Sequence, residues 1–571
     1  MKKIIKISII SLALLAGHGC DDVLDVENVS ALDPVAVWSD ETLTNAFLAR
    51  LYQITMPGAW PLDAGNSDEG YGLLAANAIT ANGHPFATFG GYYSDIRQLN
   101  TLFTEIDGGT LEEDFKNEIK GQAHFLRAWT YFNLVVRYGG VPIIKNVQNL
   151  EDDLQVSRNS TGETFDFIIE DLDNAISLLD GFQGSKGRIN EAIALAFKGR
   201  VLLYKASPQF NPSNPFDNQY WSQALTATET AMNELAQMGY ALESNYANIW
   251  SNENTSEAVM PVIFSDPDRL NGRRENCVRP LSISKNCTGG DVPVWNFVES
   301  YPMADGYQPG DVNSAYTYDM ATYWENRDPR FYATVLYNAS IAEFEGVAGR
   351  RIYLEESVGD PVDVFAPGVQ IGDAKTGFYC LKGLEIDLSQ AEVETNDVDW
   401  IEIRYAEVLL NFAEAANENG RGAEAIQVLR DIRQRAGIEP GAGNTYGIAS
   451  GMSRDAIRDA IYHERYIELA FEGKRFWDLR RARRLHTQLD GLRKTGLLPD
   501  LKAGANPADA ATFSLIPTDF DYSIEDIVTG VEPVMVTPES YYFFPITQNH
   551  LDENPNLEQN ADWGGTFDPT L

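Results

Sequence analysis

Three successive amphipathic helical patterns between Ile401 and Arg484 constrain the fold of this chain more than any other feature. In each of them, apolar residues recur at the three- and four-residue spacing of a buried helix face. Gly420 ends the first pattern, since glycine readily adopts the left-handed conformation that stops a helix, and Ala425 lies in the returning helix. The block therefore predicts helices that fold back on one another and pack as pairs.

Beyond residue 40, the chain divides into a helical region, residues 41–250, and a more irregular region, residues 251–571. The second region contains the helical block 401–484. The length of the whole chain allows two or more subdomains. Helical patterns in the first region cover 41–56, 93–107, 113–138, 163–179, 190–206 and 219–238. In the second region, short runs typical of strands cover 258–265, 330–337, 350–354, 376–382 and 541–546, and residues 498–538 form a polar insertion.

The first twenty residues have the composition of an export signal. Lysines at positions 2, 3 and 6 precede an apolar run, residues 7–16, which is too short to span a bilayer, and small residues lead to Cys20. This pattern resembles a bacterial lipoprotein signal, although Gly17 stands where Leu or Val is usual. We expect residues 1–19 to be removed, Cys20 to be lipidated, and residues 20–40 to form a tether. An ordinary secretory signal is the alternative. No later apolar run reaches the roughly 18 residues of a membrane span.

Charge and cysteine content restrict the partners and the redox setting. The formal net charge of −39 argues against nucleic acid and anionic lipid surfaces, which require clustered Lys and Arg. The membrane contact is therefore expected through the N-terminal lipid alone. An exported chain can form disulfides. Cys277 and Cys287, ten positions apart, are the candidate pair, with Cys380 as a buried thiol, but free thiols remain an alternative.

Two carboxylates in the helical block have a catalytic and a structural interpretation. Glu464 and Glu468 lie one helical turn apart, a spacing that suits general acid–base chemistry. The same spacing puts them on a face with apolar residues, where a buried carboxylate must pair with a cation. Because Arg465, Arg475 and Arg480 are close in sequence, we favour a structural clamp and predict no catalytic residue.

Cofactor and metal motifs are weak. Residues 420–425 fit the Gly-x-Gly-x-x-Ala pattern of dinucleotide-binding loops, but they join two helices instead of a strand and a helix, so no cofactor is expected. Asp266, Asp268 and Asn271 offer oxygen ligands at alternating spacing, yet the bidentate Glu of a calcium loop is missing. We predict no metal site, with calcium as the open alternative.

Aromatic residues outside the helices are the better binding candidates. Sugars stack on aromatic rings while amide, carboxylate and guanidinium groups bind their hydroxyls. Two irregular segments, 57–89 and 266–314, combine such groups. The predicted ligand-binding residues are Trp60, Asn66, Asn82, Arg273, Arg274, Trp295, Asn296, Tyr301 and Tyr307. The alternative for Trp60 and Trp295 is that they anchor the loops to the helical core.

Nine segments, in order, are similar to the SusD/RagB family, the outer-membrane nutrient-binding lipoproteins of Bacteroidetes-type bacteria. They are CDDVLDVE, FLRAWTYFNLVVRYGGVPII, GRVLLYKASPQFN, YPMADG, NRDPRFYATVLYN, RYAEVLLNFAEAANENG, RDIRQRAGI, ERYIELAFEGKRFWDLRR and PITQNHLDENPNLEQN. The resemblance implies a mainly α, SusD-like fold in which four tetratricopeptide-like helix pairs are decorated by irregular loops and short β elements. The family's ligand contacts come from variable loops, so no binding residue can be carried over.

The resemblance also implies a function without catalysis. The leading hypothesis is a lipoprotein anchored in the outer membrane and facing the exterior. It would capture an oligosaccharide and deliver it to a SusC-like TonB-dependent transporter. One alternative of the same architecture binds peptides, for which an acidic surface favours basic sequences, or another nutrient. The others are a secreted hydrolase that uses Glu464 and Glu468, and an adaptor that only gates the transporter.

Overall fold

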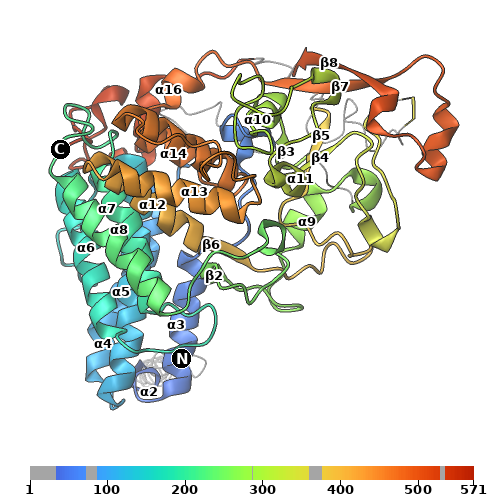
Figure 1. Ribbon diagram of the computed structural model, residues 1–571. Helices are drawn as coiled ribbons and strands as arrows, with labels where there is room; N and C mark the ends of the chain where they lie inside the picture. The colour runs from blue at the N-terminus through green and yellow to red at the C-terminus, as the bar shows by residue number, and fades with distance from the viewer. Residues whose placement is uncertain are drawn as a thin grey trace, which may run out of the picture.

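Helices and irregular structure occupy opposite sides of the molecule (Figure 1). The computed structural model describes residues 34–72, 86–285, 287, 289–355, 357–358, 376–527 and 534–571. Long helices form one side, and loops with two-stranded sheets form the other. The predicted mainly α fold with short β elements is confirmed.

The helical side is built from helices that pack in chain order. The N-terminal helices are α2 (Pro34–Val37), α3 (Glu41–Thr55), α4 (Phe89–Glu105), α5 (Glu113–Tyr138), α6 (Thr161–Leu178), α7 (Glu191–Ala206) and α8 (Tyr220–Gln237). The pairs α5–α6 and α7–α8 make extensive contacts. Side-chain caps fix the starts of two helices: Asp40 accepts from the amides of Thr42 and Leu43, and Ser160 forms a capping box with Glu163.

The block between residues 401 and 484 completes this side. It begins with strand β6 (Trp400–Arg404) and continues as α12 (Tyr405–Glu418), α13 (Gly422–Arg435), α14 (Arg454–Glu468) and α15 (Arg475–Arg481). Helix α12 packs on α8 and α13, and α14 packs on α12. Gly420 has φ of +79°, the left-handed conformation expected at the end of α12. Short helices α16 (Leu485–Gln488) and α17 (Gln548–Glu553) lie further along the chain.

The strands of the described residues pair antiparallel in four sheets of two. The pairs are β1 (Gly70–Tyr71) with β3 (Val292–Pro293), β2 (Ala258–Val262) with β6, β4 (Val335–Tyr337) with β5 (Phe378–Cys380), and β7 (Thr495–Leu501) with β8 (Phe520–Asp526). The last pair lies largely in the predicted polar insertion, where no strand was expected. Short helices α9 (Gly272–Val278) and α10 (Trp295–Glu299) interrupt the loops.

Three predicted strands need correction. Residues 330–334 belong to helix α11 (Pro329–Thr334), because Asp328 caps its start and proline is favoured at the first helical position. Residues 350–354 form only an isolated bridge between Ile341 and Arg351. Residues 541–546 begin in a 3₁₀ turn, and their side chains are buried.

Cys277 and Cys287 form a disulfide, with an S–S distance of 2.03 Å, and Cys380 is a buried free thiol. Among the described helices, none is both long and apolar enough to cross a membrane. The predicted lipidation site, Cys20, lies outside the described residues.

Candidate functional site

Glu464 and Glu468 lie in a fully buried group of ion pairs. Glu464 accepts from Arg330 at 2.6 Å and from Arg433 at 2.7 Å. Glu468 accepts from Arg330 at 2.8 Å and from Arg404 at 2.7 Å. Both carboxylates have 0% exposure, so no substrate reaches them, and the structural clamp is the interpretation that their positions support.

We call the whole group the ion cluster. It pairs the cations of Arg330, Lys382, Arg404, Arg433 and Arg435 with the carboxylates of Glu257, Asp328, Glu464, Glu468 and Glu472. Burial would raise the pKa of Glu468, but the surrounding guanidinium groups outweigh burial and hold it well below its usual value. The ion cluster ties α11, α13 and α14 to strands β2 and β6.

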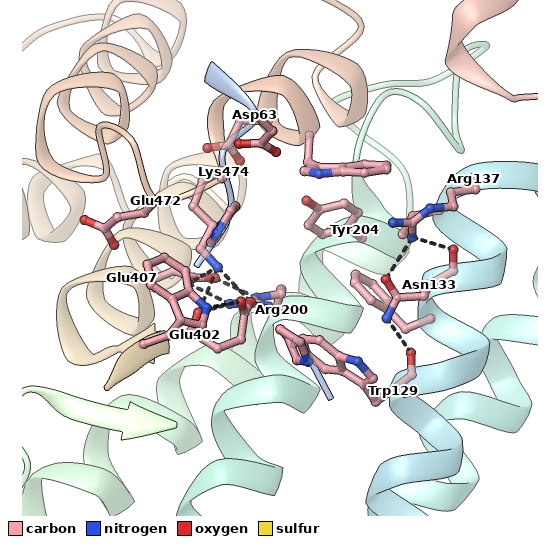
Figure 2. Close-up of a pocket in the computed structure, with 18 of the residues that line it drawn as sticks. Asp63, Trp129, Asn133, Arg137, Arg200, Tyr204, Glu402, Glu407, Glu472 and Lys474 are labelled. Carbon is pink, nitrogen blue, oxygen red and sulfur yellow. Dashed lines mark hydrogen bonds and ion pairs between the residues drawn. The ribbon is translucent and has the colours of Figure 1, made fainter. Parts of the chain in front are cut away.

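A cavity of about 240 Å³ opens beside the ion cluster, between α5, α7, β6 and α15 (Figure 2). We call it the central cavity. Its aromatic lining is Trp129, Phe132, Tyr204, Trp400 and Trp477, and its polar lining includes Asp63, Asn133, Arg137, Arg200, Glu402, Glu407, Glu472 and Lys474. The volume lies just below the range of about 300–1,000 Å³ that is typical of small-molecule pockets. It suits a single ring of a larger ligand.

The periodicity of each element explains which side chains face the central cavity. On α5, Trp129, Asn133 and Arg137 are spaced by four residues and therefore share one face of the helix. Arg200 and Tyr204 have the same spacing on α7. Trp400 and Glu402 are separated by two residues on β6, the spacing that keeps strand side chains on one side.

Ion pairs hold the β6 wall of the central cavity in place. Arg200 donates to Glu407 at 2.7 Å and to Glu402 at 2.8 Å, and Lys474 donates to Glu402 at 2.8 Å. Burial raises the pKa of Glu407, but the charges of Arg200 and Lys474 outweigh burial and lower that pKa to about 2. These carboxylates are therefore ionised and already occupied by protein cations.

Asp63 and Arg137 differ from these paired groups. Within the described part of the chain, neither takes part in an ion pair. Burial, followed by the charge of Asp291, raises the pKa of Asp63 to about 7. Arg137 donates to the carbonyl oxygen of Asn133 at 2.9 Å and to its side-chain oxygen at 2.8 Å, and Figure 2 shows both residues on α5 at the cavity. Among the described residues, both side chains therefore keep polar atoms that no ion pair occupies.

The residues predicted in the first irregular segment lie behind the cavity wall. Trp60 is 3% exposed. The centroid of its ring lies 4.7 Å from that of the Trp400 ring and 4.8 Å from the guanidinium carbon of Arg274. Arg274 is itself buried and donates to Asp291 at 2.9 Å. Asn66 is buried in a short turn. Because only 3% of Trp60 is exposed, whereas Trp477 is half-buried, the Trp60 ring has no free face for a sugar, and its expected stacking role is replaced by packing.

In the second irregular segment, Trp295 and Asn296 begin α10 and Tyr301 follows it, and none of the three lines the central cavity. Trp295 and Tyr301 are 2% and 0% exposed and pack in an aromatic cluster, so they too are corrected to packing residues. Asn296 accepts from the amide of Thr495 at 2.8 Å, and Tyr307 is half-buried. Asn82 and the side chain of Arg273 lie outside the described residues. Asp266 and Asp268 are exposed whereas Asn271 is buried, so they form no common metal cage.

The central cavity is lined instead largely by side chains from the helices. Trp129 and Trp477 belong to amphipathic helices, where an aromatic residue is more often a packing residue. The sequence feature that indicates a binding site here is the pair of polar residues Asn133 and Arg137. Two polar residues on the same face as Trp129 conflict with a purely apolar contact.

This arrangement of helix pairs with small sheets is shared by solved SusD-like structures. One SusD-like protein of Bacteroides fragilis superposes with a TM-score of 0.74 at 25% identity, covering 93% of this chain and 98% of that chain. A SusD-like carbohydrate-binding protein of the same species gives a TM-score of 0.70 at 22% identity, covering 91% of this chain and 99% of that chain.

The sequence comparisons extend the likeness from fold to family. The model of the SusD family matches residues 239–563, and a model described as starch-binding associating with outer membrane matches residues 24–203. The chain therefore belongs to the SusD (SusD/RagB) family. A SusD-like protein of Formosa agariphila is 26% identical over 378 residues, which are 65% of this chain and 66% of that relative.

Proposed function

We propose that this protein binds a carbohydrate at the outer-membrane surface and that the central cavity holds one ring of the glycan. The observation that carries the proposal is the meeting of Trp129, Tyr204 and Trp477 with the amide of Asn133 and the guanidinium of Arg137 in one cavity. Aromatic faces and convergent polar groups are the chemistry that sugars require. A solved neighbour described as carbohydrate-binding and a family model described as starch-binding support it.

We extend the proposal to anchoring and delivery. Cys20 carries a lipid that holds the protein in the outer membrane, facing the exterior, and the bound glycan passes to a SusC-like TonB-dependent transporter. The export pattern of residues 1–20 and family membership support this placement. The protein binds without turnover, since the paired carboxylates Glu464 and Glu468 have no access to a ligand.

Isothermal titration of the purified chain against starch- and laminarin-derived oligosaccharides tests the site. Trp477→Ala should weaken binding at least about tenfold, the range expected for a central aromatic anchor. Trp563→Ala is the matched control, because Trp563 is also half-buried but does not line the central cavity.

A panel of basic peptides is titrated in parallel. Binding of peptides in place of glycans would show that the ligand class is wrong. Equal losses in Trp477→Ala and Trp563→Ala would show that the central cavity is not the site.

A further inference from the structure

Arg137 stands out among the cations of the central cavity because its charge is not neutralised. The other cations in the lining, Arg200, Arg465 and Lys474, each contact a carboxylate. Arg137 contacts none among the described residues. One terminal nitrogen donates to Asn133, while the buried Nε atom has no hydrogen-bond partner in the described structure.

A second guanidinium without a carboxylate lies close by. Arg480 is 1% exposed and donates to the carbonyl oxygens of Tyr541 and Tyr542 at 3.1 and 2.6 Å, whereas its Nη1 atom has no described partner. The guanidinium carbons of Arg137 and Arg480 lie 4.7 and 4.9 Å from the Trp477 ring centroid. Burial, followed by the charge of Arg137, lowers the pKa of Arg480 to about 9. Arg480 is therefore charged at neutral pH.

This local positive charge is unusual in a chain with a formal net charge of −39. Residues 73–85, which precede Phe86 in the sequence, contain no Asp or Glu to serve as a counter-ion. A partly desolvated cation is costly unless an anion accompanies it. The planar guanidinium matches the spacing of oxygens in a carboxylate or a sulfate group.

We propose that the central cavity selects an acidic sugar, with the carboxylate of a uronic acid or a sulfate ester at Arg137 and the sugar ring against Trp477. The proposal rests on the proposed glycan-binding function and names the class of its ligand. Asn133 lies beside Arg137, and its Nδ2 donates one hydrogen to the carbonyl oxygen of Trp129 at 2.9 Å, which leaves the second for the same oxyanion or for a neighbouring hydroxyl. Asp63 lines the same cavity and is substantially protonated up to neutral pH, so it donates a hydrogen bond where an ionised group would repel an anion.

The test uses pairs of probes that differ only in charge. Tetragalacturonate is compared with its methyl ester, and a sulfated carrageenan tetrasaccharide with its desulfated form, by isothermal titration of the full chain. Laminaritetraose is the neutral reference. The charged member of one pair should bind about ten- to hundredfold more tightly than its neutral partner, as expected for a charge-assisted contact. The pair that shows the preference distinguishes carboxylate from sulfate.

Variants assign the preference to Arg137. Arg137→Gln should remove the ten- to hundredfold preference for the charged over the neutral partner, whereas Arg137→Lys should keep part of it. Asn133→Asp should also abolish the preference, because it supplies an internal carboxylate to Arg137. Arg50→Gln is the matched control, since Arg50 is an exposed arginine on α3 that does not line the central cavity.

The outcomes separate this inference from the function on which it rests. The acidic-sugar proposal would be overturned if, in both pairs, the charged probe and its neutral partner bound with equal affinity. A preference for the charged probe that survives in Arg137→Gln would also overturn it. If laminaritetraose still binds in that case, the glycan-binding function stands. If no probe binds, both proposals fail. Salt dependence in the wild type gives a check that needs no variant, because only charged probes should lose affinity as salt rises.

Discussion

Replacing Glu468 with glutamine is the sharpest test of how the ion cluster holds the fold together. The change keeps the shape of the side chain but removes one of five negative charges that balance five positive ones. Glu468 contacts Arg330, Arg404 and Arg435, and none of these four side chains is more than 5% exposed. The variant therefore leaves a buried positive charge without compensation.

The structure sets the size of the effect. Removing one partner from a buried ion pair typically costs about 3–5 kcal/mol, because the remaining charge stays desolvated. At roughly 2.1 cal/mol/K per residue, the unfolding entropy of a chain of this length is about 1.2 kcal/mol/K. A loss of this size lowers Tm by about 3–4 °C. Glu424→Gln is the matched control: Glu424 pairs with Arg421 at a site where it is 50% exposed, so less than about 1 kcal/mol is expected.

The assay is urea unfolding together with thermal unfolding, at pH 7 and at lower pH. Because the folded pKa of Glu468 lies below its unfolded value, its contribution is complete above the unfolded pKa. The contribution falls as the pH drops through the folded pKa. The gap between wild type and Glu468→Gln should thus be full at pH 7 and shrink below about pH 4. A gap under about 1 kcal/mol at pH 7, or one that grows in acid, would refute the reasoning.

Two further predictions concern the wall of the central cavity. Gly473→Ala should lower both Tm and glycan affinity, because Gly473 has φ of +68° and a Cβ there would lie 2.8 Å from Cγ of Pro61, which lines the cavity. Gly420→Ala is the control, because Gly420 has a similar φ but open space around it, and this variant should lower Tm without changing glycan affinity. Equal glycan affinities for the two variants would contradict the argument. Asp63→Asn should have the same stability as the wild type near pH 4 and should become progressively more stable than the wild type as the pH rises to about 7. The reason is that burial raises the pKa of Asp63 to about 7 in the folded chain. Between these pH values the carboxyl ionises more readily in the unfolded chain, which favours unfolding of the wild type. Thermal unfolding at several pH values checks this, and parallel curves would rule it out.

The helical half of the fold could be predicted because one physical requirement, the burial of a helix face, leaves a regular trace in the sequence. Helices α3 and α5 begin at the predicted residues, Glu41 and Glu113. Short strands leave a weaker trace. The segment after Asp328 has the composition of a strand, but the cap from Asp328 and the proline at position 329 start a helix. The segment that starts at Tyr541 has the composition of a strand but begins in a 3₁₀ turn, with its side chains buried.

The candidate site was harder to predict because its residues come from distant segments. Trp129 and Trp477 are 348 positions apart, and no spacing rule relates them. Composition alone also cannot distinguish a loop tryptophan that faces a ligand from one that anchors the loop. Trp60 proved to be the second kind, with its indole nitrogen donating to the carbonyl oxygen of Phe471 at 3.3 Å. Its neighbours in sequence, Pro61 and Asp63, nevertheless line the central cavity.

The turn after α14 connects the scaffold to the site. Glu472 accepts from Arg404 and Lys382 in the ion cluster, and it also lines the central cavity. Two residues later, Lys474 pairs with Glu402 on the β6 wall. Because Gly473 between them allows the left-handed backbone that sends these side chains to their separate partners, the ion cluster and the cavity wall share one rigid support. The helical block between residues 401 and 484 thus also shapes one wall of the cavity, which is why a residue such as Lys474 can serve both the fold and the site.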